Sequence, residues 1–196
     1  MTAPQLWNLA VLSVTRPADA ARTILAMDLP RGTLWTALAL AVVLNTLLYG
    51  LSGMVMPAPQ TVPAMFDIPG LYLVIVGGGL VMSIYAITWV GRLMGGQGGF
   101  DQVMALIVWL QFLRVAVQAA TLVLALTVPA LAVLLVLAAA LIGLWLMLHF
   151  VDQAHRLGSL GRAAFVLVGA VFAIAIFVYL LMLLLGGAIL GLSPHV

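Results

Sequence analysis

The chain has 196 residues, of which only 6% are charged and 66% are hydrophobic, and its formal net charge is +2. A water-soluble fold is excluded, because its surface needs more polar groups than this chain can supply. Disulfide and thiolate chemistry are excluded because there is no cysteine. Nucleic-acid binding is excluded because the seven basic residues form no clustered basic face.

Five apolar stretches, separated by charged or turn-forming residues, predict an all-α polytopic membrane protein. A helix of about 20 apolar residues is long enough to cross the hydrocarbon core, which is about 30 Å thick. A single membrane domain over residues 1–196 is the simplest organisation, since no segment is long enough for a separate soluble domain. The predicted spans are about 33–53, 70–94, 101–126, 130–151 and 163–192.

Proline, glycine and polar residues mark the predicted connections between these spans. A proline-rich connector covers 54–69, and Pro129 divides a long uncharged run into two helices joined by a tight hairpin at 127–130. A glycine turn at 95–99 precedes Asp101, whose carboxylate is favourable at a helix N-terminus. We also expect a polar link, residues 152–162, before the last span.

Residues 1–31 predict a cytoplasmic, amphipathic helix at the membrane interface. Pro17 is typical of a first helical position, and the apolar and polar side chains after it fall on different faces. Trp7 suits the headgroup boundary. Two compatible interpretations stay open. The helix lies on the membrane and contacts anionic lipid, or it packs over the cytoplasmic mouth of the helix bundle.

The arginines predict the orientation of the chain, because positive residues favour the cytoplasmic side of a membrane. The connectors on the other side of the predicted spans contain no Arg or Lys. We therefore expect a cytoplasmic N-terminus and a periplasmic C-terminus in a bacterial inner membrane, the source being inferred from the coding bias of the composition. Six of the seven arginines fall on the cytoplasmic side: Arg16, Arg22, Arg31, Arg92, Arg156 and Arg162.

The seventh arginine, Arg114, lies within the predicted third span, roughly 20 Å along the helix from Asp101. A charge in hydrocarbon costs a few kcal/mol or more, so this side chain should face the bundle interior or a water-filled cavity. Gln111 and Gln118 share its helix face and form a candidate polar seam. The seam lines a cavity or binds a lipid headgroup, or else it bonds to other helices or a partner subunit. We favour the structural interpretation, because no acidic residue lies deep in another span.

A second group of polar residues, His149, Asp152, His155 and Arg156, lies near the cytoplasmic end of the fourth span. The two histidines are six positions apart and do not share a helix face, so the group predicts a hydrogen-bonded interfacial cluster and no metal site. One specific hypothesis is that His149 pairs with Asp152 and orders the polar link.

The sequence contains no motif that indicates catalysis. The glycine turn at 95–99 follows no strand and lacks the lysine of a phosphate-binding loop. No serine elbow, HExxH motif or paired intramembrane aspartate is present. We therefore predict no enzyme activity, no catalytic residue and no cofactor.

The order of several features resembles the Yip1 family of five-span membrane proteins. They are Pro17-Ala18-Asp19-Ala20-Ala21-Arg22 before the first span, the Gly-Gly-Gln-Gly-Gly-Phe turn at 95–100, Trp109 with Phe112, His149-Phe150, Ala154-His155-Arg156, and Gly161-Arg162-Ala163. The eukaryotic members are implied in vesicle traffic and contact Rab-type GTPases. This chain lacks their long acidic N-terminus and Asp-Leu-Tyr-Gly-Pro signature, so the GTPase contacts are not carried over, and it resembles the bacterial branch.

Two functions follow from these features. The leading hypothesis is a non-enzymatic protein that organises or contacts other membrane components through helix packing and a basic cytoplasmic face. Its partners would be the phospholipid bilayer, with anionic lipid at the cytoplasmic face, and a second copy or a larger membrane complex. The alternative is a transporter or lipid-moving protein that uses Gln111, Arg114 and Gln118.

Overall fold

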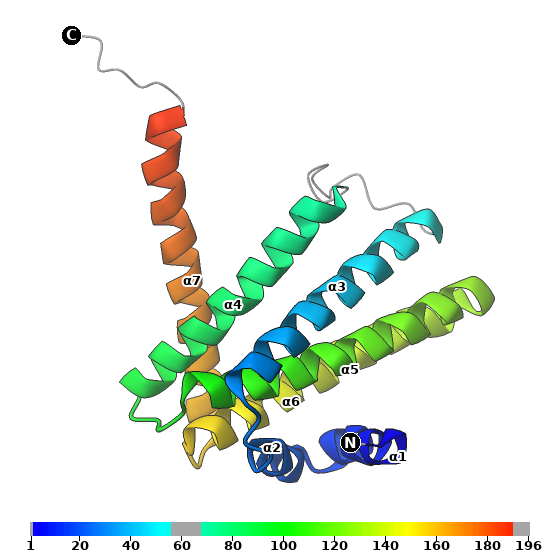
Figure 1. Cartoon of the computed structure of the whole chain (residues 1–196), viewed down its shortest axis with the longest axis horizontal. Helices are drawn as coiled ribbons and strands as arrows, with labels where there is room; N and C mark the ends of the chain where they lie inside the picture. Colours follow the sequence, from blue (N-terminus) through cyan, green and yellow to red (C-terminus); the bar gives the residue numbers. More distant parts are fainter. Residues whose placement is uncertain (1, 56–67, 190–196) are drawn as a thin grey trace.

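The computed structural model describes the backbone of residues 2–55 and 68–189, with side chains for 2–54 and 68–184. These residues fold into helices joined by short connections, which confirms the predicted all-α class (Figure 1). The helices are α1 (Ala3–Thr15), α2 (Pro17–Leu25), α3 (Arg31–Val55), α4 (Pro69–Leu93), α5 (Phe100–Thr127), α6 (Pro129–His155) and α7 (Leu160–Ile189).

Helices α3 to α7 are each long and apolar enough to cross a membrane. Their ends lie close to the predicted boundaries, since each is set by a proline, a glycine or a charged residue. Val128 alone separates α5 from α6, and Pro129 begins the second of these helices. The proposed end of the last span, 190–192, and most of the proline-rich connector lie outside the described residues.

Helix α6 is one turn longer than the sequence predicts, so the polar link is shorter than 152–162. Asp152 and His155 are helical, and the helix ends at Arg156, which adopts a left-handed conformation with φ of 53°. The amide of Leu157 donates to the Asp152 carbonyl at 3.1 Å, which closes the last turn. Polar composition suggested a loop, but these hydrogen bonds extend the helix.

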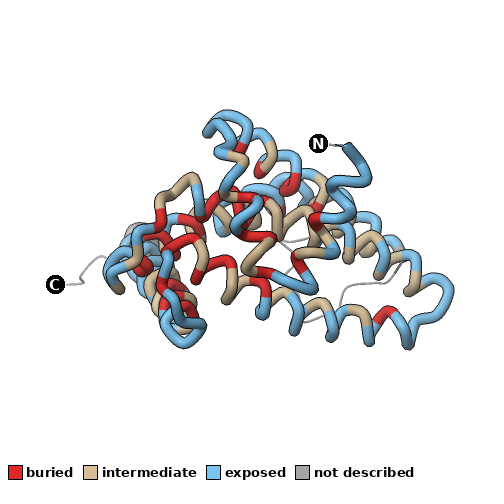
Figure 2. Tube along the Cα trace, turned by 90° about the horizontal axis from the view of Figure 1, so that it is seen from below, coloured by how far each residue is buried: buried red, intermediate tan, exposed pale blue. Residues whose placement is uncertain are grey.

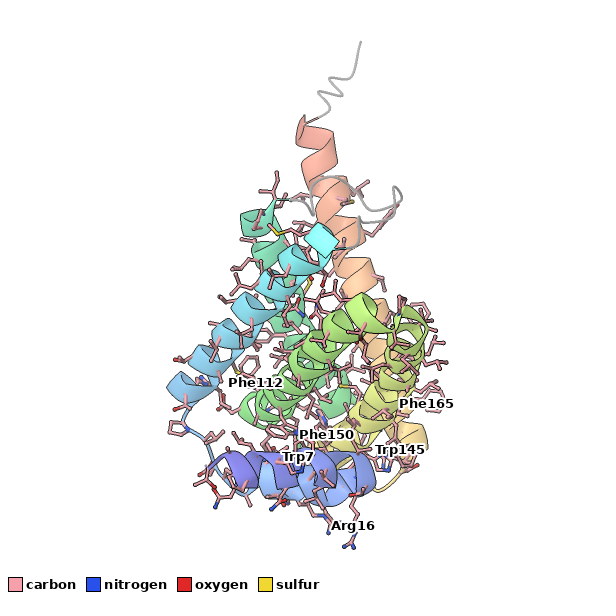
Figure 3. The ribbon with its side chains drawn as sticks, turned by 90° about the vertical axis from the view of Figure 1, so that its right-hand side faces the viewer. Trp7, Arg16, Phe112, Trp145, Phe150 and Phe165 are labelled. Carbon is pink, nitrogen blue, oxygen red and sulfur yellow. The ribbon has the colours of Figure 1, made fainter. Side chains whose placement is uncertain are left out.

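The N-terminal segment forms two helices instead of the single helix that the sequence predicts. The chain breaks at Arg16, and Pro17 occupies the first turn of α2, as expected. Helix α2 buries Ala20, Ala21 and Ile24 while Arg22 stays exposed. Both short helices lie across one end of the bundle, and Arg16 points away from it (Figure 3). The interpretation of a helix packed over the end of the bundle therefore holds.

Buried residues gather at the end of the bundle where α1 and α2 lie (Figure 2). Helix α5 buries residues 103–108 next to its N-terminus, and α7 buries Ala163, Val166 and Ala170 in its first three turns. Toward the other end the helices diverge, and α7 stands apart from α3, α5 and α6 (Figure 1). The apolar side chains there remain exposed in the isolated chain, which suits contact with lipid tails.

Candidate functional site

The six arginines other than Arg114 lie at or near helix ends on one side of the molecule, together with α1 and α2 (Figure 1). Two of them form ion pairs. Arg31 at the start of α3 donates to both carboxylate oxygens of Asp101 at the start of α5, at 2.8 and 3.2 Å. Arg22 pairs with Asp19 at 3.0 Å within α2. Within the described residues, the exposed side chains of Arg16 and Arg156 form no ion pair.

Aromatic rings surround the Arg31–Asp101 pair. Phe100, which follows the glycine turn, lies against Trp35 on α3 and Tyr85 on α4, with ring centroids 6.1 and 4.6 Å apart. The Arg31 guanidinium lies 5.8 Å from the Phe100 centroid, within reach of a cation–π interaction. These contacts join the N-termini of α3 and α5 to α4.

His155 is fully buried, and three glycines enclose its ring. A β-carbon at Gly91, Gly96 or Gly98 would overlap side-chain atoms of His155. The Nδ1 atom of His155 lies 3.3 Å from the Val151 carbonyl. The glycine turn between α4 and α5 is thus a close-fitting cover for the end of α6.

Backbone hydrogen bonds fix this turn against α6. The amide of Gln97 donates to the His155 carbonyl at 3.0 Å, and Arg92 Nε donates to the Gly98 carbonyl at 3.1 Å. Gly95 has a φ of 83°, a left-handed backbone conformation that residues other than glycine rarely adopt. Sequence reasoning named both the turn and His155 but did not bring them together, because they are more than 50 positions apart.

Arg162 joins the start of α7 to the same structure. Its Nη2 atom donates to the Met94 carbonyl at 2.8 Å, and Nη1 donates to the Leu157 carbonyl at 3.2 Å. Both acceptors lie at helix C-terminal ends, where a cation is favourable. This arginine therefore links the connection after α4 to the connection after α6.

The predicted cluster of His149, Asp152, His155 and Arg156 does not form a single network. His149 Nδ1 lies 2.9 Å from the Trp145 carbonyl and its ring packs on the indole, so the hypothesis of a His149–Asp152 pair is wrong. Asp152 instead accepts from the Ser159 amide at 2.9 Å and from Gln153 at 3.0 Å. It caps the connection to α7. No group of three or more potential metal ligands lies together in the described ranges.

The three residues of the polar seam separate into two environments. Gln118 accepts a hydrogen bond from Asn45 Nδ2 at 3.1 Å, and the Tyr72 hydroxyl donates to Asn45 Oδ1 at 3.0 Å. This chain of hydrogen bonds connects α3, α4 and α5. Gln111 and Arg114 line a different region, an open groove between α1, α5 and α6 with a volume of about 800 Å³.

The groove is mostly apolar. Helix α1 forms one wall with Trp7, Val11 and Val14, and small residues of α5 and α6 form the floor. The Arg114 side chain is exposed and makes no hydrogen bond or ion pair within the described part of the chain. A charged group in such a setting is typical of a binding site.

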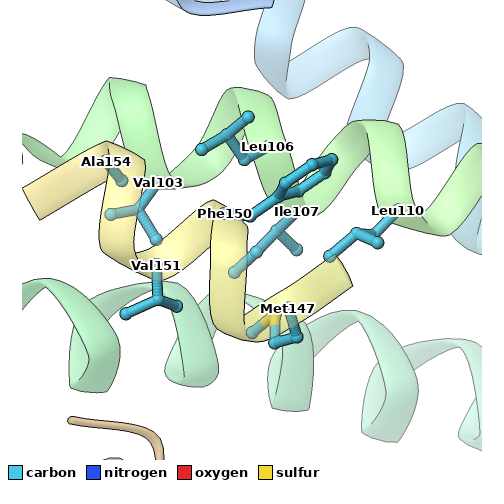
Figure 4. Close-up of a pocket in the computed structure, with 8 residues that line it drawn as sticks. All are labelled: Val103, Leu106, Ile107, Leu110, Met147, Phe150, Val151 and Ala154. Atoms are coloured by element: carbon cyan, nitrogen blue, oxygen red, sulfur yellow. The ribbon is translucent and has the colours of Figure 1, made fainter. Parts of the chain in front are cut away.

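A second, much smaller cavity between α5 and α6 measures about 10 Å³ (Figure 4). It is lined only by apolar side chains, among them Leu106, Ile107 and Phe150. A buried water needs two to four polar partners, which these residues do not offer. The cavity is therefore a small packing defect in the core.

The glycine turn at 95–99 lies between the second and third of the long helices, α4 and α5, as the resemblance implies. The profile of the Yip1 domain matches residues 11–191. The chain belongs to the Yip1 family. No curated protein and no solved structure matches it. As a Yip1-family chain with five long apolar helices, it is a multi-pass membrane protein.

Proposed function

We propose that this Yip1-family chain is a non-enzymatic protein of a bacterial inner membrane that holds anionic phospholipid at its basic cytoplasmic end. The observation that carries the proposal is the gathering of six arginines at the end where α1 and α2 lie. Arg16 and Arg156 are exposed there without a carboxylate partner in the described residues. Each arginine near an anionic surface contributes about 1 kcal/mol to binding.

The two short helices support an interfacial position for this end. Trp7 and Leu6 on α1 keep 70% and 43% of their surface exposed, with Trp7 at the edge of the groove, while Ser13 attaches the helix to the bundle. An exposed tryptophan beside exposed arginines is typical of the boundary between headgroups and acyl chains. A cytoplasmic N-terminus and five crossings of the membrane by α3 to α7 are part of this proposal, because together they place all six arginines at the cytoplasmic surface.

The test measures thermal unfolding of the purified protein in mild detergent with added dioleoyl phosphatidylglycerol or dioleoyl phosphatidylcholine. The anionic lipid should raise the melting temperature more, and the difference should shrink as salt rises. The double variant Arg16→Gln/Arg156→Gln should lose about half of that difference. The control Thr15→Gln/Gln153→Asn, which changes no charge, should keep it. Equal stabilisation by both lipids would refute the proposal.

A second candidate function, movement of lipid or another solute, is favoured by the groove that contains Arg114. If it is correct, Arg114→Ala should abolish lipid movement in proteoliposomes while the protein remains folded and monodisperse. The hydrogen bonds of Gln118 to Asn45 support a structural role for that part of the seam. Wild-type proteoliposomes that move no lipid would remove this candidate.

A further inference from the structure

The groove between α1, α5 and α6 combines an apolar surface with a single unpaired cation. Its volume of about 800 Å³ lies within the range of about 300–1,000 Å³ that is usual for small-molecule sites. Small residues line the groove on both long helices, including Ala116 and Ala120 on α5 and Ala139 and Gly143 on α6. A β-carbon at Gly143 would meet no atom within 4 Å.

Arg114 gives the groove its chemical specificity. An arginine beside apolar groups is stabilised by an anionic partner, and the described part of the chain offers Arg114 no carboxylate. A guanidinium donates two parallel hydrogen bonds to a phosphate, because its fork of donors matches the spacing of two phosphate oxygens. Gln111 lines the same groove and supplies a neutral donor close by.

The level of Arg114 in the membrane agrees with a headgroup phosphate. Trp109 Nε1 donates to Ser13 Oγ of α1 at 2.9 Å, so this point of α5 lies beside the interfacial helix. Arg114 is five residues further on, which corresponds to roughly 7.5 Å of helix. A long arginine side chain spans most of that distance. The roughly 20 Å separation from Asp101 thus overstates its depth, because α1 already lies beside α5 at Trp109, eight residues after Asp101.

We propose that this groove binds one phospholipid, with its phosphate on Arg114 and an acyl chain along the small residues of α5 and α6. The proposal rests on the interfacial position of α1 given under the proposed function. The exposed arginines attract anionic lipid without a fixed geometry, whereas this groove would be a single defined binding site. An acyl chain suits the apolar floor, and a free phosphate ion would leave that floor uncovered.

The test is native mass spectrometry of the detergent-solubilised protein with added dioleoyl phosphatidylglycerol, dioleoylglycerol or inorganic phosphate. The wild-type protein should retain one phosphatidylglycerol and much less dioleoylglycerol, and phosphate should not compete at millimolar concentration. Arg114→Gln should lower phosphatidylglycerol retention at least tenfold and make it equal to that of dioleoylglycerol. Efficient competition by phosphate would show a site for the free ion and overturn the proposal.

A second variant keeps the arginine and fills the groove. Ala139→Phe should abolish retention of the lipid, whereas Leu137→Phe, on α6 but outside the groove, should retain it. Arg16→Gln/Arg156→Gln should also keep the single lipid at high salt, so loss of the diffuse attraction and loss of this site are separable. Full retention in folded Arg114→Gln or Ala139→Phe, or a lipid-free dimer in the wild type, would overturn the proposal.

Discussion

At the scale of single residues, the ring of His155 occupies a position that only glycines can surround. Gly91 belongs to α4, whereas Gly96 and Gly98 belong to the turn that follows it, so the ring joins the ends of α4 and α6. The buried imidazole contributes packing, and its Nδ1 atom contacts the Val151 carbonyl. A change in volume on either side of this contact should therefore be felt strongly.

The first prediction concerns that contact. Gly91→Ala should lower the melting temperature in detergent, because overpacking a filled site costs about 1–3 kcal/mol. The matched control is Gly78→Ala in the same helix, where an added β-carbon meets nothing within 4 Å. It should leave the melting temperature unchanged or raise it slightly. Adding His155→Ala to Gly91→Ala should recover part of the loss, and strictly additive effects would contradict the direct contact.

Residue types and spacing were sufficient to identify Arg114, because a charge inside an apolar run is visible in any sequence. They were not sufficient to assign its neighbours. Helical periodicity placed Gln111, Arg114 and Gln118 on one face, but it could not show that Asn45 satisfies Gln118 while the groove leaves Arg114 unpaired. Contacts between residues far apart in sequence depend on how helices cross, which periodicity does not encode.

At the scale of elements, α1 is attached to the bundle by few contacts. Ser13 is fully buried, donates to the Leu9 carbonyl at 2.8 Å and accepts from Trp109 at 2.9 Å, while most of the helix stays exposed. A helix of 13 residues has little stability by itself. Its position beside the groove therefore depends on the burial of Leu9 and on the hydrogen bond between Ser13 and Trp109.

The second prediction follows from this attachment. Trp109→Phe removes the indole donor, and because one hydrogen bond contributes about 1 kcal/mol, amide exchange in residues 3–15 should quicken about fivefold. Trp89→Phe is the control, because Trp89 on α4 is 60% exposed and has no part in this contact. In Trp89→Phe, amide exchange in residues 3–15 should stay at the wild-type rate. Equal protection of α1 in both variants would show that other contacts hold this helix.

The helices themselves were largely predictable. Long apolar runs must be helical in a membrane, since every backbone polar group has to be satisfied within its own segment. Proline and glycine then set most of the ends. The extension of α6 to His155 was missed because it depends on the hydrogen bonds of Asp152 and on the cover that the glycine turn provides. Neither can be recognised from local composition.

At the scale of the whole molecule, packing is concentrated at the arginine-bearing end, and the other end is open. Lipid tails are as apolar as the exposed side chains there, so separation of the helices carries little hydrophobic cost. The number and order of the long helices were predictable from the sequence, whereas their divergence was not. Hydropathy reports that a segment is apolar but does not distinguish lipid from a neighbouring helix as its surroundings.

The central claim, that the arginine-bearing end faces the cytoplasm, has a direct test because the chain contains no cysteine. Single cysteines at Ser159, beside this end, and at Val128, between α5 and α6, are labelled with a membrane-impermeant maleimide in spheroplasts and in inside-out vesicles. We predict that Val128→Cys reacts only in spheroplasts and Ser159→Cys only in inside-out vesicles. Reaction of both from the same side, or the reverse pattern, would contradict the account.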